Sequence, residues 1–165
     1  ETIPDHSFEN GFCAICDLCE EPQTIDGVYQ LANAGNLFWF AKHVNENEAS
    51  ANAALVADID LENRPWTPIG TTGENNNNFR GVFDGQGHII TGLNVTGTKN
   101  GIGFFGEVRT GTVENFTIYG EVTVQARSSS GRPNVREFDI NHYLEKIKKK
   151  SQLTLDDVES VFGKL

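Results

Sequence analysis

Four residues near the N-terminus have side chains that commonly bind metal ions. His6, Cys13, Cys16 and Cys19 follow one another with six, two and two residues between them. A Cys-x2-Cys spacing lets two thiolates hold one tetrahedral zinc ion from a tight loop, and the other two residues would complete the ligand set. The alternative is a small disulfide, for example from Cys13 to Cys16 or Cys19, which leaves one thiol free. Neither interpretation is catalytic, because no motif links these cysteines to a base.

Three carboxylates in the middle of the chain are candidate catalytic groups. Asp58 and Asp60 lie on one face of an expected strand, and Asp84 lies in a Phe-Asp-Gly turn. A glycosidase needs two such groups about 5 to 9.5 Å apart. Aspartates at turns more often accept hydrogen bonds from backbone N–H groups, and the first two alternate with apolar residues as a solvated face does. Trp39 and Trp66 could stack on sugar rings, but packing roles are favoured for both. We therefore expect no catalysis and assign no catalytic residue.

Charge is distributed unevenly along the 165 residues, whose net charge is −10. Residues 1–125 carry 5 Lys and Arg against 17 Asp and Glu, whereas residues 126–165 carry 8 against 6. The acidic part would repel phosphates, so no nucleic-acid partner is expected for it. No run approaches the roughly 20 apolar residues of a membrane span. Because methionine is absent, we expect a processed or excised piece. The predicted parts are a Cys/His head (1–22), a Gly/Asn-rich body (23–125), a linker (126–133) and a helical tail (134–165).

The body is predicted to combine one helix with short strands. Asn33 can act as the N-cap of a helix that runs to His43. Its apolar residues recur with helical spacing and form one face: Leu37, Phe40, Ala41 and Val44. Residues 54–61 end in an alternation of apolar and acidic residues, which is typical of a half-buried strand.

Short apolar runs bounded by glycine recur along the body. Residues 93–97 align with residues 116–120 at a spacing of 23, and Ile59 would belong to an earlier turn of the same repeat. A period in the twenties with glycine corners is typical of a parallel β-solenoid, in which apolar side chains of successive turns stack. An ordinary β-sandwich with a coincidental spacing is the alternative.

A family resemblance favours the solenoid. The segments 66–70, 79–93, 103–106 and 113–116 resemble GLUG-type repeats of secreted and cell-wall-anchored proteins of bacteria, and residues 29–41 resemble the lead-in of such modules. The resemblance covers about residues 25–124. It implies a mainly β fold, a short right-handed parallel β-solenoid with an N-terminal capping helix, followed here by the C-terminal helical tail. Gly103-Phe104-Phe105-Gly106 departs from the more frequent Gly-Leu-Phe-Gly.

The resemblance also implies a role at the outside of a bacterial cell. The chain is expected to be a noncatalytic surface or secreted module that acts in adhesion or as a structural spacer, with an unknown protein or glycan as partner. The tail gives an alternative function. Two short amphipathic helices, near residues 139–150 and 154–165, are too small to be stable alone and should dock on the open end of the solenoid, on another copy or on a partner. The change of composition and the Ser-Ser-Ser-Gly stretch before the tail also fit a fused segment. A carbohydrate-active β-helix enzyme is the least favoured hypothesis.

Overall fold

The computed structural model describes residues 5–72, 77–98 and 100–125. The chain divides into two units, Glu1–Gln125 and Ala126–Leu165. Every described residue belongs to the first unit, which contains both the head and the body. The predicted linker (126–133) and helical tail (134–165) lie outside the described residues. In the described part of the chain, no helix is long and apolar enough to cross a membrane.

Two antiparallel hairpins open the chain. The first pairs β1 (Phe8–Glu9) with β2 (Phe12–Cys13), and the second pairs β3 (Gln23–Ile25) with β4 (Val28–Leu31). Their turns are Asn10-Gly11 and Asp26-Gly27, and all four of these residues have positive φ angles. Asn-Gly and Asp-Gly are the residue pairs that a two-residue hairpin turn prefers, because glycine reaches positive φ without steric cost.

The single helix of the described residues is α1 (Ala34–Glu46). Its N-cap is Asn33, whose side chain accepts a hydrogen bond of 2.8 Å from the backbone N–H of Asn36. The prediction of a helix capped by Asn33 is confirmed. The predicted apolar face is confirmed as well, because Leu37, Phe40, Ala41 and Val44 are all buried.

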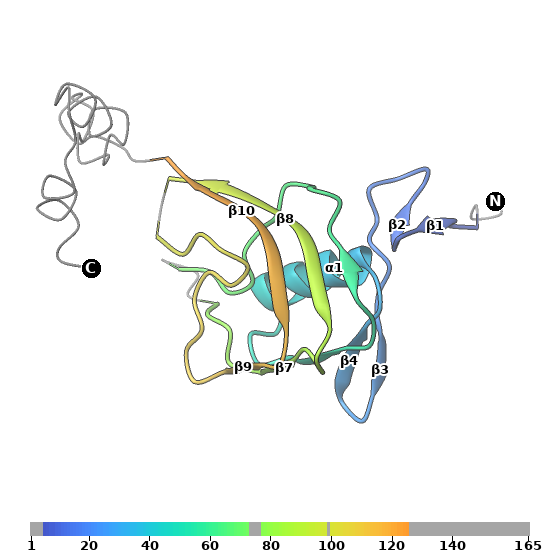
Figure 1. The fold of residues 1–165 in the computed structure, drawn as a ribbon. Helices are drawn as coiled ribbons and strands as arrows, with labels where there is room; N and C mark the ends of the chain where they lie inside the picture. The colour runs from blue at the N-terminus through green and yellow to red at the C-terminus, as the bar shows by residue number, and fades with distance from the viewer. Residues whose placement is uncertain (1–4, 73–76, 99, 126–165) are drawn as a thin grey trace, which may run out of the picture. The chain divides into compact units, whose positions relative to one another are not determined.

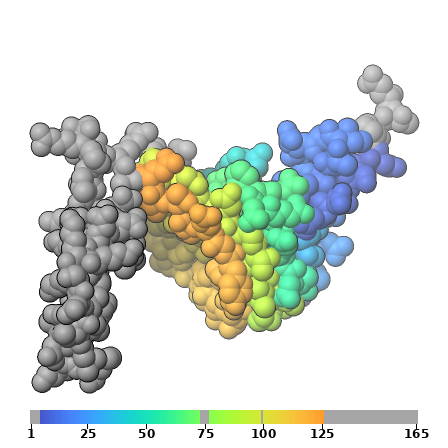
Figure 2. Space-filling model, turned by 45° about the horizontal axis from the view of Figure 1, so that its top comes forward, coloured from blue at the N-terminus to red at the C-terminus, as the bar shows by residue number. Residues whose placement is uncertain are grey.

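The remaining strands pair in parallel and form two sheets. The five-stranded sheet has the order β3-β4-β5-β7-β9 and adds β5 (Asn52–Leu55), β7 (Val82–Asp84) and β9 (Thr112–Glu114). The three-stranded sheet has the order β10-β8-β6 and contains β6 (Ile59–Asp60), β8 (Ile89–Gly97) and β10 (Thr117–Val124). In Figure 1, β8 and β10 lie side by side in front of α1. Figure 2 shows β10 in orange beside the yellow-green β8 on one face.

The prediction of a short right-handed parallel β-solenoid is wrong. The five-stranded sheet is mixed, because β3 runs antiparallel to β4, and β1–β2 form a separate antiparallel pair. The physical reason is the two tight turns, which reverse the chain where a parallel arrangement needs a crossover. The register differs too, since Leu93 pairs with Gly120 and not with Phe116. The strand expected over residues 54–61 is divided between β5 and β6, which belong to different sheets.

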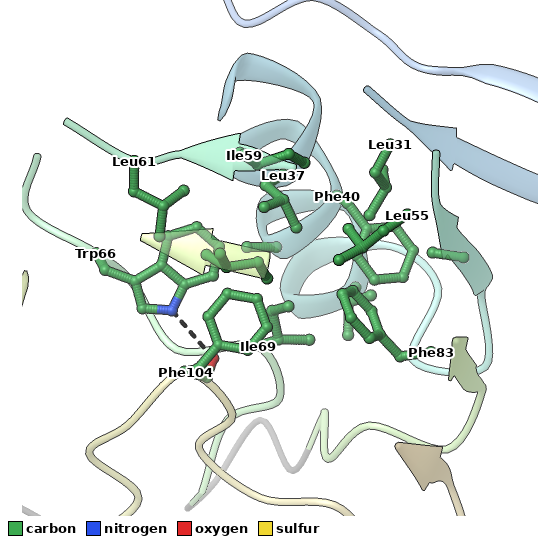
Figure 3. Packing of buried hydrophobic residues seen from close by; sticks show 14 of the residues in the cluster. Leu31, Leu37, Phe40, Leu55, Ile59, Leu61, Trp66, Ile69, Phe83 and Phe104 are labelled. Atoms are coloured by element: carbon green, nitrogen blue, oxygen red, sulfur yellow. Dashed lines mark hydrogen bonds between the residues drawn. The ribbon is translucent and has the colours of Figure 1, made fainter. Parts of the chain in front are cut away.

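One core joins both sheets and α1. Leu31, Leu55 and Phe83 come from the five-stranded sheet, and the side chains of the helix pack against them (Figure 3). Ile59 and Ile90 come from the three-stranded sheet. Trp66 is buried beside them and donates a 3.0 Å hydrogen bond from Nε1 to the carbonyl oxygen of Phe104, which the dashed line in Figure 3 marks. Burying a large apolar side chain contributes about 1.5–3 kcal/mol, so this core is the main source of stability.

Candidate metal centre

The β1–β2 hairpin and the loop that follows it position the sulfur atoms. Cys13 ends β2, and its backbone N–H donates to the carbonyl oxygen of Leu18 at 3.0 Å. The N–H of Ala14 donates to Ser7 O at 2.9 Å, which brings the segment before β1 against the same loop. These two bonds bring His6 close to Cys13 and Cys16.

The three side chains His6, Cys13 and Cys16 form a compact donor cluster, called here the head cluster. Their potential ligand atoms all lie within 4.8 Å of one another. Nδ1 of His6 is 3.3 Å from Sγ of Cys13 and 3.6 Å from Sγ of Cys16. Ligand atoms of a tetrahedral zinc with ordinary Zn–S and Zn–N lengths are about 3.6 Å apart. The observed separations therefore suit one small metal ion held by all three residues.

Cys19 is not a member of the head cluster. It pairs with Phe12 in an isolated antiparallel bridge, and it follows Leu18, whose carbonyl oxygen closes the loop by accepting from Cys13 N. It nevertheless lines the same hollow of about 370 Å³ as Cys13 and Cys16. The pKa of its thiol is raised, chiefly because the group is buried. Of the four residues predicted from sequence, the structure thus brings three together and places the fourth nearby. All three cysteines are free thiols.

The cluster favours a thiolate at Cys13. The hydrogen bond from His6 lowers the pKa of this thiol to about 6, and the N–H of Ile15, 3.5 Å from the sulfur, adds to the effect. The pKa of Cys16 is raised, first because of its hydrogen bond with Cys13. A thiolate is the form of cysteine that binds metals, so Cys13 is prepared for coordination.

Contacts with the body hold the head in place. The carbonyl oxygen of Asn10 accepts a hydrogen bond of 2.9 Å from the backbone N–H of Gly35. Its side-chain Oδ1 accepts one of 3.2 Å from the backbone N–H of Ala34. These are backbone donors of the first turn of α1, which the helix itself cannot satisfy. The guanidinium of Arg64 lies 3.9 Å from the ring centre of Phe12. The head therefore completes the N-terminus of α1.

Sequence reasoning did not single out Asn10 and Arg64. The Asn10-Gly11 pair carried a usable signal, because it is the strongest short-range indicator of a hairpin. Arg64 carried none, since its contact with Phe12 joins residues that are 52 positions apart.

The candidate carboxylates are engaged with the backbone. Asp58 Oδ1 accepts from Ile89 N at 2.9 Å, and Asp60 Oδ1 accepts from Glu62 N at 2.8 Å. Asp84 Oδ1 accepts from Gln86 N at 2.9 Å. Asp60 and Asp84 stabilise turns in this way, which is the role that the sequence favoured. Asp58 instead bridges to the start of β8, 31 residues further along the chain, and its Oδ1 also lies 3.1 Å from Nδ1 of His88.

These bonds predict a loss of stability in acid. The backbone N–H of Ile89 and then His88 lower the pKa of Asp58 below its ordinary value of 3.8, and Gln86 N–H and then Asn115 do the same for Asp84. A lowered native pKa gives stability that is complete above 3.8 and is lost as the pH falls through the native value. The midpoint of urea unfolding should fall as the pH is lowered below about 4. The slope of this midpoint against pH should be smaller in Asp84→Asn than in the parent and unchanged in Glu121→Gln. Equal slopes in the parent and both variants would contradict the prediction.

The two tryptophans differ in their surroundings. Trp66 is a core residue with 5% of its surface exposed, as the packing interpretation expected. Trp39 is half-buried and lines a hollow of about 460 Å³ between the head and the outer face of α1. Sequence reasoning gave no sign of this hollow, because its walls come from separate segments.

Comparisons with known proteins add no relative. No family model, no curated protein and no solved structure matches this chain, so the resemblance to GLUG-type repeats stays a prediction.

Proposed function

We propose that this chain is a noncatalytic module whose N-terminal head is held together by a structural zinc ion. His6, Cys13 and Cys16 would be its ligands from the protein. The observation that carries the proposal is the head cluster, with its three donor atoms within 4.8 Å of one another. Thiolate and imidazole ligands favour zinc over magnesium or calcium, which prefer oxygen.

A zinc ion here would stabilise more than a surface loop. Cys13 ends β2, and His6 and Cys16 lie on either side of the β1–β2 hairpin, whose Asn10 completes the first turn of α1. Metal binding free energy becomes folding free energy when the site does not exist in the unfolded chain. The ion would therefore support the contact between the head and the core helix.

The module's wider role is proposed from the sequence. The GLUG-like segments favour a secreted or surface-attached bacterial protein that acts in adhesion or as a spacer. The backbone bonds of Asp58, Asp60 and Asp84 support a noncatalytic role, because each of these carboxylates already accepts a hydrogen bond from a backbone N–H. Binding of the full chain to immobilised host-matrix proteins would favour adhesion, and no binding would favour the spacer.

The zinc proposal is tested by metal content. The reduced full chain, loaded with zinc and then desalted, should retain about one zinc per molecule by elemental analysis. His6→Ala, Cys13→Ser and Cys16→Ser should retain much less than the parent. A chelator should lower the melting temperature of the parent and leave that of Cys13→Ser unchanged, because only a native state that binds metal gains stability from it.

Cys19→Ser is the matched control, since it removes a thiol outside the head cluster. Its zinc content should equal that of the parent. A loss equal to that of Cys13→Ser would instead make Cys19 the fourth ligand. A parent chain that retains no zinc, and whose mass after purification without reductant is two hydrogens lower, would replace the zinc with a disulfide.

A further inference from the structure

The hollow beside Trp39 is the strongest feature that the proposed zinc site does not use. It is called here the α1 groove. One wall comes from the head, with Phe8, Asp17 and Glu21, and the other from α1 and its C-terminal end, with Trp39, Lys42 and Asn47. Its volume of about 460 Å³ lies within the range of about 300–1,000 Å³ that small-molecule sites occupy.

The indole of Trp39 is held rigidly in this groove. It stacks on the ring of His43 with 4.7 Å between ring centres and 12° between the planes. His43 is itself fixed, because its Nε2 shares a hydrogen bond of 3.3 Å with the hydroxyl of Tyr29 and lies 3.4 Å from Oε2 of Glu48. A rigid aromatic side chain loses little entropy on binding and offers a large apolar surface.

Four exposed polar side chains of the groove are free, in contrast to His43 and to those of the neighbouring body. Within the described residues, the side chains of Asp17, Glu21, Lys42 and Asn47 make no hydrogen bond or ion pair, and all four are exposed. Asparagines nearby are used differently: Asn36 donates to Glu20 O, and Asn45 donates to Pro68 O. The groove therefore presents acceptors, a donor group and an amide around one aromatic ring.

We propose that the α1 groove binds a neutral saccharide. A sugar ring has an apolar face that packs on an aromatic ring and a rim of hydroxyls, each of which donates and accepts hydrogen bonds. The side chains of Asp17 and Glu21 can accept hydrogen bonds from these hydroxyls, Lys42 can donate them, and Asn47 can do both. An anion would meet the two carboxylates of the head wall, and an organic cation would meet the ammonium group of Lys42. A neutral hydroxylated ligand is compatible with all four.

The test titrates the zinc-loaded full chain with three neutral tetrasaccharides: cellotetraose, maltotetraose and chitotetraose. At least one should bind by calorimetry and change the tryptophan emission, because Trp39 lines the groove whereas Trp66 is 5% exposed. Trp39→Ala should weaken binding about tenfold or more, the equivalent of one lost aromatic contact. Asp17→Asn should weaken it by a smaller factor.

Asp26→Asn is the matched control, since it makes the same change at the exposed tip of the β3–β4 hairpin, away from the groove. It should bind as the parent does, and circular dichroism should show that Trp39→Ala is folded. If Trp39→Ala does not fold, Lys42→Ala replaces it, with a weakening expected. The proposal is overturned if none of the three sugars binds at about 10 mM, if the groove variants bind as well as the parent, or if choline binds in their place and depends on Trp39.

The zinc site and the saccharide site can fail separately. The head supplies one wall of the groove, so Cys13→Ser is titrated alongside the parent. Sugar binding by a parent chain that retains no zinc would support the groove and reject the metal. A parent chain that retains zinc but binds no sugar would support the zinc site and reject the saccharide site.

Discussion

Replacement of Phe83 by alanine should lower the free energy of unfolding by about 3–5 kcal/mol. The side chain of Phe83 is fully buried and lies between the sheets and α1. Its ring contacts four other phenylalanine rings at centre distances of 5.4 to 6.2 Å: Phe40, Phe104, Phe105 and Phe116. Loss of the ring removes its transfer free energy and leaves a cavity that these neighbours cannot fill without moving.

The neighbouring residue supplies the control for this variant. Val82 precedes Phe83 on β7 and is 43% exposed, so Val82→Ala should cost much less. Urea unfolding of the three proteins measures both effects. A loss in Phe83→Ala no larger than that in Val82→Ala would mean that the aromatic cluster is not the centre of the core.

Replacement of Gly35 by alanine should destabilise the protein by about 1–3 kcal/mol. In an ordinary helix interior the same change stabilises by about 1 kcal/mol, because glycine is a poor helix former. Here the added Cβ would overlap the carbonyl group of Gly11, where the head hairpin packs against α1. Backbone atoms cannot turn aside as a flexible side chain can, so the head or the helix must shift.

Thermal unfolding compares Gly35→Ala with Glu46→Ala, a change at an exposed position of the same helix. Glu46→Ala should have little effect on the melting temperature, whereas Gly35→Ala should lower it. A rise in Gly35→Ala would show that helix propensity outweighs the close approach of the two glycines.

The helix was predictable from sequence because its signals are local. Asn33 and the apolar spacing from Leu37 to Val44 lie within a few turns, so cap and face follow directly from the residue types. The register of the parallel strands was not predictable in this way. Phe116 is apolar like Leu93, but it lies just before β10 and packs its ring on Phe83 and Phe104. Alignment of apolar residues alone therefore paired Leu93 with the wrong partner.

The metal cluster was predictable in part for the same reason. Cys13 and Cys16 are separated by two residues in one loop, and this short spacing alone places their sulfur atoms close together. Cys19 lies one step beyond the closing bond from Cys13 N to Leu18 O, and that bond cannot be read from residue types. The α1 groove depends on the packing of the head against a helix, which no local pattern reports.

The spacing of the parallel pairs also bears on how fast the protein folds. Phe83 pairs with Ala53 and with Val113, 30 residues away in either direction, and Ile90 pairs with Ile59. To form each pair, the chain must close a loop of about 30 residues. The chain entropy is lost before the contacts between the strands contribute their free energy. Proteins dominated by such distant contacts fold in milliseconds to seconds, not microseconds. The ribosome releases β5, β7 and β9 in the order in which they pair, so each strand meets a neighbour that is already present.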